Sequence, residues 1–369
     1  MRIIVDTFVL TSATTGIRTY CLELCEGLMA LDQSEHEFRF PGYTFFRRNL
    51  LFGTRNHAWA KVANHLSYLL WKQLVLPIYV LFSRADAVLS PDYVLPVWPG
   101  RKGFVVYHDV FFWEYPAHYN KWWRKYYTHL SLASVNKQTV IVATSHYTKD
   151  KLRKLLFSDE PIEVVYQSPS AAHHSERQTS PPADQKPYLL HVGYYDKRKN
   201  LPVLIQAFAM LLREHPDCEW QLKLAGSRAA APDLDDWDQV QELIHAHGLE
   251  RRVEQLGFVA SEVLTGLYQH TDAFIFPSYD EGFGIPIVEA MRYGLPVVVS
   301  DQGASREVLG EDAECIFQYD DPNALKACLQ RLLDPGFRQT KSRRSLERAR
   351  DFGREKFATD MVKMISGYA

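Results

Sequence analysis

The chain has 369 residues, and at roughly 100 to 200 residues per domain this length predicts two domains. Its composition, 46% hydrophobic and 13% aromatic, excludes a disordered protein and provides enough apolar side chains for two cores. The formal net charge of −2, without a nucleic-acid-binding motif, argues against nucleic acid as a partner.

The first ten residues, MRIIVDTFVL, are interpreted as a strand. They show no charged region followed by a long apolar run and a cleavage site, so a signal peptide is not expected. The five cysteines form neither a CxxC nor a Cys/His metal pattern, which is typical of a reducing compartment. Together these features predict a cytoplasmic protein.

Short apolar runs alternate with helical patterns through the first half. Continuous rather than alternating hydrophobicity indicates strands covered on both faces, as in parallel α/β sheets. A helical pattern, with apolar residues three and four positions apart, covers residues 17–31. The strands expected in this half are residues 2–6, 86–90, 103–108, 139–145 and 162–166.

Residues 38–85 are basic and aromatic and contain no acidic residue. The apolar run 66–82 is a poor membrane-spanning candidate, because Lys72 interrupts it and Pro77 would kink it. One interpretation is an amphipathic face that rests on anionic lipid, and the other is a core helix with a solvated basic edge. The first interpretation predicts a membrane and acceptor patch formed by Arg47, Arg48, Arg55 and Lys61.

The segment SPSAAHHSERQTSPPADQKP, residues 168–187, has no hydrophobic period and is predicted to be a linker. After it the β/α alternation restarts, and a basic helical tail is expected from about Arg343 to Tyr368. The pattern predicts an α/β fold of two doubly wound, Rossmann-like domains facing across a cleft at the carboxyl ends of their strands. The predicted boundaries are a first domain at 1–170, a linker at 171–186, a second domain at 187–350, and a C-terminal helix at 351–369 that packs back on the first domain.

The stretch YDEGFGIPIVEAMRYG, residues 279–294, combines two carboxylates with a predicted helix start. Gly282 and Gly284 remove side chains where a ligand can approach backbone amides, and such a helix amino terminus favours an anion such as a phosphate. Glu281 and Glu289 lie beside it. Carboxylates repel phosphates, so their expected partners are hydroxyl groups. The ligand that carries both groups is a nucleotide sugar.

EGFGIPIVE resembles the Glu-x7-Glu motif of family 4 retaining glycosyltransferases, and the flanking FPS, EAM, GLPVVVSD and SREV are similar to that family as well. The resemblance spans nearly the whole chain and is strongest over residues 187–320. It implies the GT-B fold, with an acceptor-binding first domain and a nucleotide-sugar-binding second domain. It also implies that Glu289 binds the nucleotide ribose and that Glu281 contacts the donor sugar near its 3-hydroxyl.

HVGYYDKRKNLPVLIQAF resembles the basic loop in which a lysine of this family neutralises the donor diphosphate. That lysine is Lys199, with Arg198 beside it as a bidentate helper. Tyr194 departs from the family, since many relatives carry an arginine there, which implies that Arg198 bears more of the phosphate charge. The implied donor-binding residues are Gly16, Arg198, Lys199, Glu281, Gly282, Phe283, Gly284 and Glu289.

Two segments of the first half complete the implied site. TTGIRTY resembles the loop whose glycine, here Gly16, lets the backbone approach the donor phosphate. YHDVFFWEYP resembles the segment whose histidine, here His108, borders the reaction centre. Tight strand-to-helix packing would also explain Gly16, and a structural hydrogen bond would also explain His108. The implied catalytic residues are His108, Glu281 and Lys199.

The resemblance implies a retaining hexosyltransferase, cytoplasmic and peripheral on the inner face of the cell membrane. HDVFFWEYP and DKRKNLPVLIQAF look most like mannosyl- or rhamnosyltransferases of bacterial O-antigen or capsule assembly, which implies GDP-mannose as donor and a polyprenyl-diphosphate-linked glycan as acceptor. No metal or other cofactor is expected, because cationic side chains and helix dipoles supply the positive charge for the diphosphate.

Three alternatives stay open at this point. The first is a rhamnosyl- or glucosyltransferase that uses a GDP-, dTDP- or UDP-sugar. The second is a sugar-nucleotide epimerase of the same fold, which needs no acceptor. The third is a catalytically inactive subunit that binds a nucleotide sugar and recruits a partner.

Overall fold

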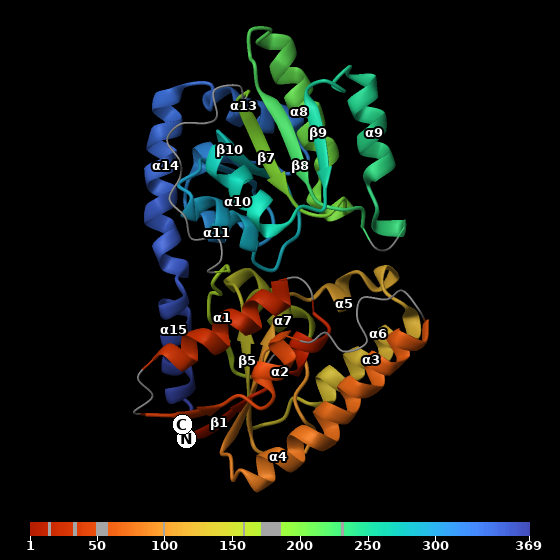
Figure 1. Ribbon diagram of the computed structural model, residues 1–369, viewed down its shortest axis with the longest axis vertical. Coiled ribbons are helices and arrows are strands. Elements are labelled where there is room, and N and C mark those ends of the chain that lie inside the picture. The colour runs from red at the N-terminus through yellow and green to blue at the C-terminus, as the bar shows by residue number, and fades with distance from the viewer. Residues whose placement is uncertain are drawn as a thin grey trace. The chain divides into compact units, whose positions relative to one another are not determined.

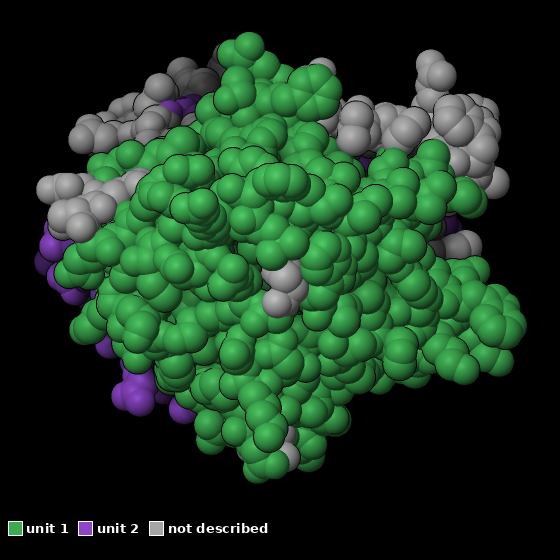
Figure 2. All heavy atoms as spheres, turned by 90° about the horizontal axis from the view of Figure 1, so that it is seen from below, with its two compact units in different colours: residues 1–169, 352–369 green, residues 170–351 purple. Residues whose placement is uncertain are grey.

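The computed structural model of the chain describes residues 1–13, 16–31, 35–48, 58–98, 100–157, 159–170, 186–229 and 232–369. They form two compact units, coloured separately in Figure 2: unit 1 is residues 1–169 and 352–369, and unit 2 is residues 170–351. Each unit is built around a six-stranded sheet of parallel strands (Figure 1). Residues 171–185 of the predicted linker lie outside the described residues.

The sheet of unit 1 has the strand order β2-β1-β3-β4-β5-β6. From β1 the chain adds β2 on one side of the sheet, and it then adds β3 to β6 in turn on the other side. The junction of β1 and β3, where this order reverses, is the switch point at which doubly wound folds bind ligands. The strands are β1 (Arg2–Val5), β2 (Glu37–Arg39), β3 (Ala87–Ser90), β4 (Lys102–Tyr107), β5 (Thr139–Ala143) and β6 (Ile162–Val164).

Helices cover both faces of this sheet. Because successive strand side chains point to opposite faces, Ile3 and Val5 pack in the core with α1 and α15, whereas Ile4 packs in the core with α4 and α7. This accounts for the continuous apolar runs of the sequence. The helices of unit 1 are α1 (Gly16–Ala30), α2 (Tyr43–Arg48), α3 (Ala58–Leu70), α4 (Leu76–Phe82), α5 (Phe111–Glu114), α6 (Lys121–Ala133), α7 (His146–Leu155) and α15 (Arg354–Ser366).

A π-helical turn, Trp71–Val75, joins α3 to α4, so the chain is helical from Ala58 to Phe82. Pro77 does not interrupt this helix. It has no N–H to offer the Gln73 carbonyl four residues before it, and the indole Nε1 of Trp98 donates to that carbonyl at 3.1 Å instead. Lys72, in the π turn, is fully buried.

Part of the basic, aromatic segment 38–85 therefore belongs to the core, as one of its two interpretations proposed. Tyr43 and Phe46 are buried there, and Tyr68 and Trp71 pack against it. Within the described residues, Val62–Phe82 is the one helical stretch long and apolar enough to cross a membrane, with 22% of its window buried. Length and composition alone are weak evidence for spanning.

The sheet of unit 2 has the order β9-β8-β7-β10-β11-β12. Numbered from the start of the unit, this is the 3-2-1-4-5-6 order of dinucleotide-binding sheets, with its switch point between β7 and β10. The strands are β7 (Tyr188–Val192), β8 (Gln221–Ala225), β9 (Val253–Gly257), β10 (Ala273–Phe276), β11 (Val297–Ser300) and β12 (Ile316–Phe317).

Around this sheet, α8 packs on α9 and α13, and α11 packs on α12 and α14. The prediction of one tail helix from about Arg343 to Tyr368 is wrong, because α14 ends at Ala349 and α15 starts at Arg354. Helix α15 lies in unit 1 and packs on α1, the unit on which the C-terminal helix was predicted to pack. The helices of unit 2 are α8 (Leu201–Glu214), α9 (Trp237–Ala246), α10 (Ser261–His270), α11 (Ile285–Arg292), α12 (Ser305–Leu309), α13 (Pro322–Arg331) and α14 (Pro335–Ala349).

Candidate functional site

Lys199 and Glu281 meet at the switch point of unit 2. Lys199 ends a single 3-10 turn in the loop after β7, and Glu281 lies in the loop after β10. Because β7 and β10 pair in parallel, their carboxyl ends lie at the same edge of the sheet. The Lys199 ammonium donates to Glu281 Oε1 at 2.5 Å, and each side chain is 14% exposed. The sequence predicted both residues for one ligand.

Glycines and a left-handed asparagine shape the loop that carries Lys199. A Cβ on Gly193 would lie 3.3 Å from Lys199 Cε, so a larger residue would crowd the lysine stem. Asn200 ends the turn at φ 56° and its side chain donates to the Pro277 carbonyl at 3.3 Å. The amide of Tyr279 donates to the Arg198 carbonyl at 2.9 Å, which ties the two switch-point loops together.

The loop after β11 holds the backbone of Glu281. The Ala304 amide donates to the Glu281 carbonyl at 2.9 Å. Gly303 has φ 67°, and a Cβ there would lie 2.7 Å from the Glu281 nitrogen, so only glycine allows this approach. Gly284, at φ 95°, caps the start of α11, as expected for a helix start built to expose amides.

Glu289 lies in the middle of α11 and is 8% exposed. Its Oε2 accepts a hydrogen bond from the Tyr268 hydroxyl at 3.1 Å. Burial, and then the nearby Glu289 charge, raise the pKa of Tyr268 well above its usual value, so this hydroxyl stays a donor. Phe283, a further predicted donor-site residue, is 3% exposed.

Arg198 binds a carboxylate of its own loop. Its guanidinium pairs with Asp196, through Nε at 3.1 Å and Nη2 at 2.9 Å, and its amide also donates to that carboxylate. The ammonium of Lys199 instead lies 4.9 Å from the centre of the Phe276 ring, a cation–π contact. A diphosphate contact by Arg198, predicted from the sequence, requires the Asp196 pair to open or to be shared.

His191 is a buried residue of this site that the sequence analysis missed. Its Nδ1 donates to the Ile275 carbonyl at 3.0 Å, and its Nε2 has no hydrogen-bond partner among the described residues. Burial, reinforced by the Lys199 charge, lowers the pKa of His191 to about 3, so the ring is neutral. The only signal in the sequence is a polar residue inside the apolar run YLLHV.

Gly16 and His108 lie on neighbouring elements of unit 1. Gly16 is the exposed first residue of α1, and one turn later the Tyr20 ring packs edge-on against His108 with centroids 4.8 Å apart. His108 follows β4, and its Nε2 donates to the Pro91 carbonyl at 2.8 Å. Burial lowers the pKa of His108 to about 4, so the imidazole is neutral near pH 7.

The predicted basic patch is described only in part. Arg47 and Arg48 are exposed at the end of α2, and Arg47 Nη1 lies 3.1 Å from Glu26 Oε1. Arg55 and the side chain of Lys61 lie outside the described residues.

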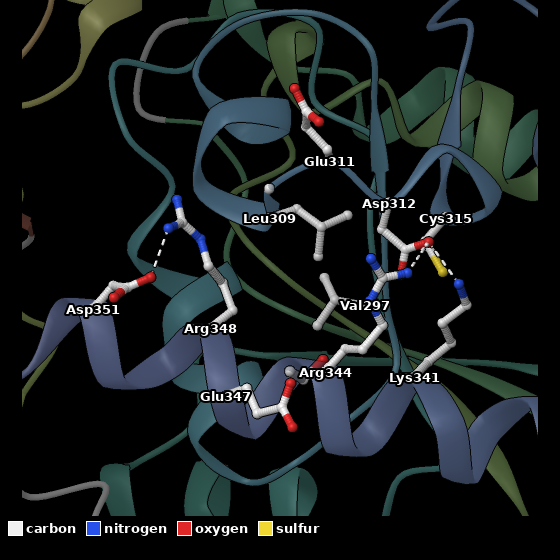
Figure 3. Close-up of a pocket in the computed structure, with 12 residues that line it drawn as sticks. Val297, Leu309, Glu311, Asp312, Cys315, Lys341, Arg344, Glu347, Arg348 and Asp351 are labelled. Carbon is white, nitrogen blue, oxygen red and sulfur yellow. Dashed lines mark hydrogen bonds and ion pairs between the residues drawn. The ribbon is translucent and has the colours of Figure 1, made fainter.

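A pocket of about 310 Å³ in unit 2 lies away from these residues (Figure 3). It borders Val297, the first residue of β11, and thus the amino edge of the sheet, opposite the Lys199–Glu281 pair. Lys341 pairs with Asp312 at 2.5 Å there, so the charge of this lysine is balanced by a carboxylate of the same pocket. In the described ranges, no group of three or more His, Cys, Asp or Glu residues is placed to hold a metal ion.

Comparison with known proteins agrees with the fold and the motifs. Residues 173–351, nearly all of unit 2, match the model of the family "Glycosyl transferases group 1". Over 386 aligned positions, covering 98% of both proteins, the chain is 28% identical to the O-antigen chain mannosyltransferase B of Escherichia coli.

Two solved structures show the same fold at low identity. Sucrose-phosphate synthase from Thermosynechococcus elongatus has a TM-score of 0.71 and 21% identity, over 99% of this chain and 98% of that one. Anabaena HepE in complex with UDP-glucose has a TM-score of 0.69 and 17% identity, over 100% of both chains. The family resemblance of the motifs is thus confirmed for unit 2: residues 173–351 match the group 1 glycosyl transferase family, and the two units each have the sheet order of the GT-B fold.

Proposed function

We propose that this glycosyltransferase moves a hexose from a nucleotide diphosphate sugar to a hydroxyl group of a glycan, with retention of the anomeric configuration. The observation that carries the proposal is the Lys199–Glu281 pair at the switch point of unit 2, 2.5 Å apart. Its two members supply what such a donor needs: a cation for the diphosphate and an acceptor for a sugar hydroxyl.

The chemistry requires stabilisation of a leaving diphosphate and of positive charge on the sugar ring. Lys199, with Arg198 and the amides near Gly282 and Gly284, stabilises the diphosphate, and no metal takes part. Donor binding exchanges the Lys199–Glu281 contact for a lysine–phosphate contact and a glutamate–hydroxyl contact. Until then the ion pair holds both side chains in place.

Three further contacts complete the proposed reaction. Glu289, held by Tyr268, accepts hydrogen bonds from the nucleotide ribose. Gly16 lets the α1 amides approach the donor phosphate, and neutral His108 borders the reaction centre. The acceptor attacks from the face that the diphosphate leaves, and the departing phosphate oxygen takes the proton of the acceptor hydroxyl.

The proposed donor is GDP-mannose, and the proposed acceptor is a polyprenyl-diphosphate-linked glycan of a bacterial surface polysaccharide. Two observations support this choice: the name of the E. coli relative, an O-antigen chain mannosyltransferase, and the segments HDVFFWEYP and DKRKNLPVLIQAF.

A lipid-linked acceptor is reached from the membrane surface, and unit 1 has a suitable face. Apolar side chains at four-residue spacing are exposed along the outer side of the helix 58–82. They are Val62 (66% exposed), Leu66 (54%), Leu70 (47%), Leu74 (48%), Ile78 (39%) and Phe82 (86%). We call these six residues the apolar ridge.

Helix α6 lies beside α3 (Figure 1), and Trp123 Nε1 of α6 donates to His65 Nδ1 of α3 at 3.0 Å. It exposes Trp122 and Tyr126 together with Lys121 and Lys125. Apolar residues flanked by exposed aromatic and basic side chains suit the interface of an anionic bilayer. The chain is therefore proposed to be a peripheral protein on the inner face of the cell membrane, with Arg47 and Arg48 as further basic contacts.

The test is a panel of GDP-mannose, GDP-rhamnose, dTDP-rhamnose and UDP-glucose. GDP-mannose should raise the melting temperature most, because a ligand that binds only the folded state stabilises it by about 2.7 kcal/mol at 100 times its Kd.

Mannose transfer to a lipid-linked acceptor should persist in EDTA. Lys199→Ala and Glu281→Ala should each lower its rate by about 100-fold or more, on the order of 3 kcal/mol.

Lys326→Ala is the matched control, since it breaks another unit 2 ion pair, with Glu214 at 2.8 Å, and should keep the rate within about twofold. Stabilisation by UDP-glucose or dTDP-rhamnose but not by GDP-mannose would overturn the donor. Conversion of one sugar nucleotide into another in the absence of an acceptor would identify an epimerase. Donor binding without any turnover would identify an inactive partner subunit.

A further inference from the structure

A lysine occupies the switch point of unit 1. Asp6 directly follows β1, and Asp92 lies two residues after β3, so both carboxylates stand where the sheet would otherwise receive a ligand. The Lys72 ammonium lies 2.6 Å from Asp6 Oδ2 and also pairs with Asp92 Oδ1. All three residues are at most 3% exposed. We call them the switch-point triad.

Lys72 reaches this place from the π turn of the helix 58–82. A π turn shifts the helical register by one residue, and such turns often occur at functional sites. The residues beside Lys72 bind the same acids: Tyr68 Oη donates to Asp92 Oδ2 at 2.7 Å, and Trp71 Nε1 donates to Asp6 Oδ1 at 2.8 Å. Burial lowers the pKa of Lys72, but the two acids outweigh it and raise the pKa above its usual value, so the ammonium stays charged.

The ammonium also holds the loop after β3. It donates to Ser90 Oγ at 2.5 Å and to the Val94 carbonyl at 2.8 Å, and it pairs with Asp92. Pro91 lies between two of these anchored residues. A single buried cation therefore fixes the position of the Pro91 carbonyl.

The Pro91 carbonyl is the group that His108 binds. A carbonyl oxygen only accepts hydrogen bonds, so the contact of 2.8 Å requires a proton on His108 Nε2. In a neutral ring this leaves Nδ1 as the acceptor. The position of the loop thus decides which nitrogen of His108 can accept a hydrogen bond.

We propose that Lys72 is a positioning residue of this transferase: by fixing the loop 90–94 it holds His108 in the Nε2–H tautomer and presents Nδ1 as a hydrogen-bond acceptor at the carboxyl edge of unit 1. The inference rests on the proposed function for the importance of His108. The tautomer itself is independent of any substrate, so the two can be tested separately.

The experiment is nitrogen NMR of the full chain labelled only at histidine nitrogen, with His108→Asn to assign the resonance. The wild type should show a protonated His108 Nε2 with a slowly exchanging proton. Lys72→Met should lose that signal, or move it towards a mixture of tautomers, and should lower kcat by about tenfold or more with KM for the donor within about twofold. Such a split is expected because the proposed donor contacts of Lys199, Glu281 and Glu289 lie in unit 2.

Lys341→Met is the matched control. Lys341 is also buried and pairs with two acids, with Asp312 at 2.5 Å (Figure 3) and with Glu314 at 2.7 Å. Both contacts lie in unit 2. It should lower stability and leave the His108 signal unchanged. If Lys72→Met does not fold, Tyr68→Phe removes only the hydroxyl bound to Asp92, and it should move the signal in the same direction by a smaller amount.

An unchanged His108 signal in folded Lys72→Met, or in Tyr68→Phe when the first variant is unfolded, overturns the inference. A changed signal with an unchanged kcat also overturns it, since His108 would then need no positioning. If the wild type transfers no sugar from any donor, the proposed function fails, and the NMR signal alone decides whether Lys72 sets the tautomer.

Discussion

His191 and Lys199 lie side by side in the proposed donor site, with a neutral buried ring beside a charged amine. A protonated imidazole there would have no second acceptor among the described residues and would repel the lysine. Its neutrality therefore leaves Lys199 as the local source of positive charge. The ring also stacks on Phe276, with centroids 6.0 Å apart, the same ring that Lys199 contacts.

The depressed pKa of His191 predicts a dependence of stability on pH. The folded-state pKa is about 3, against a usual 6.5, so between these values the unfolded chain binds a proton that the folded chain does not. The free energy of unfolding therefore falls as the pH falls through this window. His191→Phe removes this contribution, and denaturant unfolding from pH 6.5 to pH 4 should show a shallower loss for the variant. An equal slope in both proteins would contradict the assignment.

At the residue scale, sequence reasoning named Lys199 and Glu281, which the structure brings into contact, and it missed the residues that hold them. Lys199 and Glu281 were predictable because both belong to recognisable motifs and both follow strands. The pairing of Arg198 with Asp196 was not predictable, since two residues in one loop can point together or apart. Lys72 was recognisable in the sequence as a lone charge inside an apolar run, and such a charge needs buried partners when the run is part of a core.

The helix 58–82 has two sides of different character. Its inner side carries Lys72 and core aromatic residues, and its outer side carries the apolar ridge. The sequence showed both characters, but it could not assign each to a side, because a π turn changes which residues share a face.

The apolar ridge predicts how the chain binds lipid. Leu70→Glu combined with Leu74→Glu should prevent flotation with phosphatidylglycerol vesicles, because two charges would have to enter the acyl region. The matched control is Phe258→Glu with Val263→Glu, two exposed apolar residues of unit 2 that gain the same charge and should leave flotation unchanged. Equal flotation of the ridge variant and the wild type would count against this surface.

Most strands were predictable, and the two that were not are short. Continuously hydrophobic runs such as TVIVA indicate a buried parallel strand. β2 and β12 have three and two residues and pair at the sheet edges, so they carry too little pattern to stand out. Their absence from the prediction did not affect the site, which is formed by loops after central strands.

At the scale of the whole molecule, the chain passes from unit 1 to unit 2 near residue 170 and returns near residue 351. The first passage was visible as a change of composition. The second was predicted at residue 351, although the basic helical region there shows no such change of composition. Its evidence is structural: Arg354 pairs with Glu23 at 2.6 Å, and a Cβ on Gly27 would lie 2.9 Å from the Ala358 Cβ, which shows how closely α1 and α15 approach.

The returning helix predicts which unit a C-terminal change will affect. Met361 is fully buried in the core of unit 1, so Met361→Ala should destabilise that unit by about 2–5 kcal/mol. Calorimetry should show an earlier transition for unit 1 and an unchanged one for unit 2. Lys363→Ala, an exposed position on the same helix, should change the free energy of unfolding by less than about 0.5 kcal/mol. A shift confined to the unit 2 transition would contradict the assignment of α15.

The return of α15 also sets an order of events during synthesis. A ribosome makes residues 1–169 first, yet Phe357, Met361 and Ile365 complete the core on one face of their sheet. That face stays partly uncovered while all of unit 2 is translated and folds. Unit 1 is therefore mostly synthesised before unit 2 but completes its core only after unit 2 has been made. A nascent chain stalled before residue 354 would expose an incomplete apolar surface to chaperones.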